Sequence, residues 1–150
     1  MIAYTDGSAR GNGKENNFGG FGVVIVEDDN QTYVSQYAHF EENTTNNIQE
    51  LKAILWVMIN YGKHNPPITV YSDSAYCVNT LTQWMYGWAR NDWVKSDNKT
   101  PENLELIKTY YELEQKGYRI NLFKIKGHAG NYWNEFADAL ATGKGEKYVN

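Results

Sequence analysis

Apolar and polar positions alternate along the chain in a way that separates strands from helices. Short apolar stretches rich in β-branched residues predict strands at residues 1–5, 19–26, 31–40, 67–72 and 118–125. Apolar residues at helical spacing predict helices from the capping residues 43–47 to about 61, from 74 through 81, from 101 to 117 and from 132 to 141.

The connections between these elements predict their arrangement. The turn signal at residues 28–30 joins the second and third strands, so the first three strands should form an antiparallel meander. The fourth strand follows a helix and can lie parallel to the first through a right-handed crossover. The order βββαβααβα predicts an α/β fold, a mixed sheet covered by helices.

Two stretches do not fit regular elements. Residues 7–18 are rich in Gly and Asn and are expected to form a loop. Residues 83–99 interrupt the helical spacing and carry three tryptophans among basic side chains, which suggests a protruding helix and loop. Tryptophan beside basic residues suits sugar and backbone contact. The alternative, that Trp84 and Trp88 only join two helices, stays open.

Composition bounds the class of protein. The 150 residues suit one domain, residues 1–150, with a flexible tail at 143–150. Cys77 is the single cysteine, so no internal disulfide can form, which suits a reducing compartment. No signal-like leader and no apolar run long enough to span a membrane is present. We therefore expect a soluble, cytoplasmic monomer with no membrane partner.

Charge is unevenly distributed along the chain. The formal net charge is -4, which argues mildly against a nucleic-acid partner. However, all the charged residues from 115 to 134 are basic: they are Lys116, Arg119, Lys124 and Lys126, and His128 lies beside them. A local basic face can hold phosphates even on an acidic protein. A merely solvated surface is the alternative.

Four acids at element ends carry the candidate chemistry. Asp6 and Asp73 each follow an apolar strand, Glu50 lies in a first helical turn, and Asp138 lies in the last helix. Neighbouring carboxylates repel each other, so a cluster of them favours a divalent cation, and all-oxygen ligands select Mg²⁺ or Mn²⁺. Alternatively, each acid could cap a turn or helix; the spacing of Asn47 and Glu50 fits a capping box.

The residues also resemble a known family. Five motifs occur in order: TDGS at 5–8, TNNIQEL at 45–51, SDS at 72–74, KGHAG at 126–130 and NEFAD at 134–138. In this order and spacing they resemble type 1 ribonuclease H, and similarity extends to residues 82–84 and 88–93. The resemblance implies a five-stranded sheet of order 3-2-1-4-5, with strands 1–3 antiparallel and strands 1, 4 and 5 parallel.

The same resemblance implies an activity. It is two-metal-ion endonucleolytic cleavage of the RNA strand in an RNA–DNA hybrid duplex, leaving 3′-hydroxyl and 5′-phosphate ends. Mg²⁺ would be the cofactor, with Mn²⁺ as a possible substitute. The implied catalytic residues are Asp6, Glu50, Asp73, His128 and Asp138, of which the four acids match the metal ligands and His128 the loop histidine. The implied hybrid-binding residues are Asn12, Thr45, Asn46, Asn47, Trp84, Arg90, Lys95 and Lys99.

Two departures from the family pattern predict weaker, salt-sensitive binding. The protrusion carries few basic residues, countered by Asp92 and Asp97, and Ala75 stands where a polar Gln is common. Two other functions compete with hybrid cleavage. A DNA-directed nuclease of the same fold is disfavoured by the asparagines aimed at 2′-hydroxyls, and a catalytically inactive binding domain is disfavoured because all four acids are present.

Overall fold

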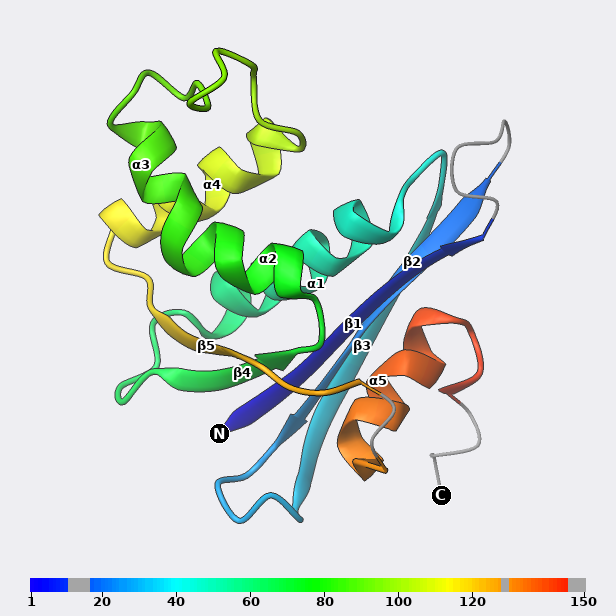
Figure 1. Ribbon diagram of the computed structural model, residues 1–150. Coiled ribbons are helices and arrows are strands. Elements are labelled where there is room, and N and C mark those ends of the chain that lie inside the picture. Colours follow the sequence, from blue (N-terminus) through cyan, green and yellow to red (C-terminus); the bar gives the residue numbers. More distant parts are fainter. Residues whose placement is uncertain (11–16, 128–129, 146–150) are drawn as a thin grey trace.

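The fold is a five-stranded mixed sheet with helices on both faces (Figure 1). The computed structural model describes residues 1–10, 17–127 and 130–145. The strands are β1 Ile2–Arg10, β2 Phe18–Val26, β3 Tyr33–Glu42, β4 Ile68–Ser72 and β5 Ile120–Lys124. Their order is β3-β2-β1-β4-β5, with β1, β2 and β3 antiparallel and β1, β4 and β5 parallel. The predicted fold class and strand order are confirmed.

The helices divide between the two faces of the sheet. They are α1 Asn46–Tyr61, α2 Ala75–Asn79, the π-helical turn η1 Thr80–Trp84, α3 Met85–Ala89, α4 Leu104–Gln115 and α5 Tyr132–Ala141. Figure 1 shows α1 to α4 on one face and α5 alone on the other. Among the described residues, none of the helices has the length and apolar character that a membrane span requires.

Strand β2 shows why a continuous apolar run is needed at the centre of the sheet. Val23 and Ile25 pack into the core beneath α1, whereas Val24 and Val26 pack against α5 through Phe136. Successive side chains of a strand point to opposite faces. Because both faces are covered here, every position from Phe21 to Val26 is buried.

Strand β1 is longer than predicted. The sequence predicted a strand at 1–5 and a loop from residue 7, but β1 pairs with β2 as far as Arg10, opposite Phe18. Its pairing with β4 stops at Thr5. Asp6 therefore lies within β1, at the first position where β4 no longer covers the strand edge. Local composition did not predict this because the strand is held by its pairing with β2.

The segment after Asp73 is also more regular than predicted. Helical structure continues from Ala75 to Ala89, and η1 adds a π-helical turn in the middle. A π-turn shifts the helical register, which accounts for the break in apolar spacing near residue 83. The following helix begins at Leu104 rather than at Pro101, because Asn103 adopts a left-handed conformation with φ of 58°.

The prediction of one domain with a flexible tail stays a prediction. Lys144 donates its backbone N–H to the Ala139 carbonyl at 2.7 Å, and Gly145 lies against Leu140. Residues 146–150 of the predicted tail lie outside the described part of the chain.

Candidate metal centre

Three of the four predicted acids meet at the edge of the sheet. Carboxylate oxygens of Asp6, Glu50 and Asp73 all lie within 4.8 Å of one another. Asp6 comes from β1, Asp73 follows β4, and Glu50 comes from the first turns of α1. Asp6 and Glu50 are each only 7% exposed. The parallel pairing of β1 and β4 brings the two aspartates together, and the packing of α1 on β1 adds the glutamate.

The fourth acid reaches the cluster from the opposite face of the sheet. Asp138 lies on α5 outside the group of three acids within 4.8 Å of one another, but it is close enough to Asp6 to be among the causes that raise the pKa of Asp6. Helix α5 comes this close because Gly22 is the cross-strand partner of Asp6. A Cβ atom at Gly22 would lie 2.5 Å from the Ala137 carbonyl oxygen, so only glycine permits this packing.

A second glycine fixes the approach of the loop after β5. A Cβ atom at Gly127 would lie 2.6 Å from Asp73 Oδ2. The backbone of this loop therefore rests directly against the Asp73 carboxylate. The next residue, His128, lies outside the described residues, so its predicted catalytic role stays a prediction.

Electrostatics at the cluster favour a cation. Burial raises the pKa of Asp6, and the neighbouring charges of Glu50 and Asp73 add to the effect. Burial also raises the pKa of Glu50, although hydrogen bonds from Asp6 and from the Gly7 N–H oppose the rise. Neither salt bridge found among the described residues involves these acids. An all-carboxylate donor set without a basic partner fits a hard divalent ion.

Capping does not explain these acids. Thr45 caps α1 by accepting a hydrogen bond from the Ile48 N–H, and Ser74 caps α2. The Glu50 carboxylate instead accepts a hydrogen bond from the Gly7 N–H of β1. The capping-box interpretation of Asn47 and Glu50 is therefore wrong, because α1 has its N-cap at Thr45, two residues earlier than that box requires.

The turn before α1 places the predicted asparagines beside the cluster. Asn46 is exposed, and its Oδ1 atom accepts a hydrogen bond from the Ala9 N–H at 2.6 Å, which fixes the side chain against β1. Asn47 follows it and is partly exposed. Asn12, the other predicted asparagine, lies outside the described residues.

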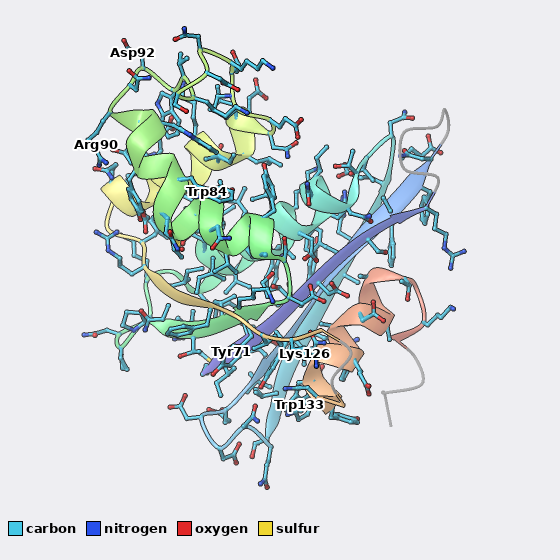
Figure 2. The ribbon with its side chains drawn as sticks, in the orientation of Figure 1. Tyr71, Trp84, Arg90, Asp92, Lys126 and Trp133 are labelled. Carbon is cyan, nitrogen blue, oxygen red and sulfur yellow. The ribbon has the colours of Figure 1, made fainter. Side chains whose placement is uncertain are left out.

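The predicted protrusion carries two adjoining grooves. Trp84 is 46% exposed and lines both of them. The first groove, of about 400 Å³, also includes Arg90, and the second, of about 310 Å³, includes Lys95. Figure 2 shows Trp84, Arg90 and Asp92 on this part of the molecule. Lys99 lies exposed in the turn beyond, where its N–H donates to Asp97 Oδ1.

The alternative role, packing between helices, fits Trp88 as well as Trp93, because both are partly buried and pack against the core. Trp93 packs edge-on against Tyr111 of α4, with ring centroids 5.2 Å apart. The ring centroids of Trp84 and Trp88 lie 6.5 Å apart, and about half of the Trp84 side chain stays exposed to solvent.

Several residues that shape the site were not found from the sequence. Gly22 could have been found, because a hairpin register places the glycines of GGFG opposite the TDGS motif. Gln49 and Asn17, two buried polar residues behind the turn at 43–45, gave no local signal. Their contacts join segments that are far apart in the chain.

Comparisons with known proteins agree with this geometry. The RNase H family model matches residues 1–145. Ribonuclease H of Thermoanaerobacter sp. is 39% identical over 140 residues, covering 93% of this chain and 85% of that protein. Ribonuclease H of Clostridium botulinum is 36% identical over 142 residues, covering 94% and 92%.

A solved structure with a similar fold comes from a virus. The foamy viral protease–reverse transcriptase in complex with an RNA/DNA hybrid matches with a TM-score of 0.83 and 19% identity. The match covers 97% of this chain and 20% of that chain, so this chain corresponds to about a fifth of the viral protein. The family match across residues 1–145, together with the two bacterial relatives, shows that this chain belongs to the RNase H family.

Proposed function

We propose that this chain is an endoribonuclease that cleaves the RNA strand of RNA–DNA hybrids and leaves 3′-hydroxyl and 5′-phosphate ends. The observation that carries the proposal is the cluster of Asp6, Glu50 and Asp73 oxygens within 4.8 Å of one another. Membership of the RNase H family supports an RNA–DNA hybrid as the substrate of that cluster, and the similar foamy viral structure holds an RNA/DNA hybrid.

In this proposal the four acids hold divalent metal. Asp6, Glu50, Asp73 and Asp138 would be the ligands, with Mg²⁺ as the physiological ion and Mn²⁺ as a substitute. When bound, the metal would activate water and stabilise the leaving oxygen. The Gly7 N–H orients the Glu50 carboxylate, and the close packing of Gly127 orients that of Asp73.

The surfaces around the cluster would bind the hybrid. Asn12, Asn46 and Asn47 would contact the minor groove, where 2′-hydroxyls are exposed, and Thr45 would lie near a phosphate of the DNA strand. The protrusion would follow the DNA strand through Trp84, Arg90, Lys95 and Lys99. We further propose that residues 1–150 act as one catalytic domain, as a monomer in the cytoplasm.

Two other functions predict different products. A DNA-directed nuclease would cut a DNA–DNA duplex, and an inactive binding domain would cut nothing. The test is to incubate labelled RNA–DNA, RNA–RNA and DNA–DNA duplexes with the protein in Mg²⁺, in Mn²⁺ and in EDTA. We expect cleavage of the RNA–DNA duplex alone and only with metal. Cleavage of the DNA duplex, or cleavage in EDTA, would refute the proposal.

The metal ligands are tested by Asp6→Asn and Asp73→Asn. Each should abolish turnover while the fold is retained, because an amide is a poor ligand for Mg²⁺ and supplies no charge. Circular dichroism checks the fold in the same samples. Wild-type activity in either variant would contradict the assignment.

The loop histidine is tested by His128→Ala. A group that accepts or shuttles a proton should slow turnover by roughly 10²-fold when removed. The measurement is single-turnover cleavage of the hybrid at saturating enzyme. An unchanged rate would mean that His128 takes no part in the reaction.

A further inference from the structure

Gln49 is a fully buried polar residue that the proposed chemistry does not use. It is 0% exposed, and its Nε2 atom donates to Glu41 Oε1 at 2.6 Å and to Thr44 Oγ1 at 2.7 Å. Its Oε1 atom has no hydrogen-bond partner among residues 1–10, 17–127 and 130–145. Burying an amide with an unused acceptor opposes folding. The two hydrogen bonds of Nε2, to Glu41 and Thr44, are therefore what a polar side chain contributes at this buried position.

The partners of Gln49 hold the turn between β3 and α1. Thr44 donates its N–H to Asn17 Oδ1 at 2.9 Å, and Asn17 Nδ2 donates back to the Thr44 carbonyl. Glu41, at the end of β3, also pairs with Lys52 of α1. The turn is thus fixed by Asn17, directly before β2, and by Gln49 of α1, which donates hydrogen bonds to the side chains of both Thr44 and Glu41.

This turn leads directly into the residues that face the proposed substrate. Thr45 caps α1, and Asn46 and Asn47 begin it. Glu50 follows Gln49 in the sequence, yet its carboxylate is held separately by the Gly7 N–H. Removing the hydrogen bonds of the Gln49 amide should therefore displace the turn between β3 and α1 and leave the Glu50 carboxylate in place.

We infer that Gln49 is a positioning residue for hybrid binding. Its amide, shared between Glu41 and Thr44, sets the position of Asn46 and Asn47 relative to the acidic cluster. This inference rests on the proposed function, because it requires the start of α1 to contact the hybrid. Disruption of the amide raises KM and leaves kcat nearly unchanged.

The first test is Gln49→Met, which keeps side-chain length and removes both hydrogen bonds. KM for the hybrid should rise about fivefold or more, because the loss of one typical hydrogen bond already has that effect, while kcat stays within about twofold. In an Asp6→Asn background, the Kd of a labelled hybrid in Mg²⁺ should rise by the same factor. Unchanged KM and Kd would overturn the inference.

Tyr61→Phe is the matched control. The Tyr61 hydroxyl contacts Ser35 Oγ at 3.2 Å and also joins β3 to α1, but at the far end of the helix. Its loss should leave KM and kcat at wild-type values. An equal rise in KM from Tyr61→Phe would show general loosening of α1 and would overturn the specific role of Gln49.

A charge swap tests the hydrogen bond independently of side-chain packing. Gln49→Glu alone faces Glu41 with a second carboxylate and should raise KM further than Gln49→Met. The double variant Gln49→Glu/Glu41→Gln restores a hydrogen bond between the two side chains, although Lys52 loses its carboxylate partner at residue 41, so KM should fall well below that of Gln49→Glu. A KM of the double variant as high as that of Gln49→Glu would overturn the inference. If wild-type protein does not cut the hybrid at all, the proposed function itself fails.

Discussion

At the scale of single residues, the site consists of acidic side chains whose ionised form is disfavoured by burial and by the charges of the neighbouring acids. Asp6 is buried beside Glu50 and Asp73, and burial together with these charges raises its pKa. Such an arrangement is unfavourable without a cation and favourable with one. The buried position that suits metal binding should therefore weaken the fold when metal is removed.

The first prediction concerns stability against pH in EDTA. Because the folded-state pKa of Asp6 lies above its unfolded value of about 3.9, its contribution is fully present at low pH and is lost as pH rises. Asp6→Asn should therefore flatten the decline in stability and add roughly 1–3 kcal/mol near pH 8, the scale of relieving a buried unpaired group. Urea unfolding at pH 5, 6.5 and 8 measures this.

Glu112→Gln on the exposed side of α4 is the control for that experiment. It removes an acid that lies outside the cluster and should leave the slope of stability against pH at its wild-type value. If Asp6→Asn and Glu112→Gln give the same slope, the pKa of Asp6 is not raised by its surroundings.

At the scale of elements, the distance between helices and sheet is set by residues that have no side chain. Gly22 lies opposite Asp6 and lets α5 bring Asp138 to the cluster. The metal centre therefore depends on how closely α5 packs against the sheet as well as on the ligands themselves.

Gly22→Ala should move α5 outward. The added methyl group would lie 2.5 Å from both the Ala137 carbonyl oxygen and Leu140 Cβ, so we expect a loss of about 1–3 kcal/mol in stability. Hybrid cleavage should fall as well, because Asp138 moves with α5. Urea unfolding and cleavage rates measure the two effects, and wild-type values for both would contradict this packing.

Gly87→Ala is the matched control for Gly22→Ala. Gly87 lies in α3, and an added Cβ would meet nothing within 4 Å. Alanine favours the helix over glycine, so stability should rise by about 0.5–1 kcal/mol.

At the scale of the whole molecule, an acidic protein must bind a polyanion through a few local positive charges. The formal net charge is -4, and the groove beside Trp84 contains Arg90 with Asp92 close to it in the sequence. The attraction that remains is local and easily screened. Activity on the hybrid should accordingly fall steeply between roughly 50 and 200 mM salt, and a flat response would contradict this account.

Asp92→Asn tests the same balance of charge. Asp92 is exposed with φ of 52°, a conformation that asparagine tolerates, so the fold should be unchanged. Removing its charge should tighten hybrid binding about twofold at low salt, the size of one surface charge interaction. Glu27→Gln makes the same change in net charge on the distant hairpin between β2 and β3, and it should not alter binding.

Much of the fold was predictable because the apolar repeats that mark strands and helices each involve residues close together in the sequence. Alternating and continuous apolar runs gave the five strands, and helical spacing gave α1 and α5 with nearly correct ends. The errors occur where tertiary contacts override local composition. Pairing with β2 extends β1 through a glycine-rich stretch to Arg10, η1 hides the continuity of the helix after Asp73, and Asn103 delays the start of α4.

The sequence by itself determined which chemistry is available: four acids on or beside four different predicted elements, capping residues at Thr45 and Ser74, and apolar runs suited to a covered sheet. Only the tertiary structure decided that carboxylates from positions 6, 50 and 73 share one site, and that a buried Gln49 holds the turn beside them. The physical reason is the distance along the chain over which each kind of information acts. Periodicity and side-chain chemistry are carried by neighbouring residues, whereas distances between remote segments are set by strand pairing and close packing.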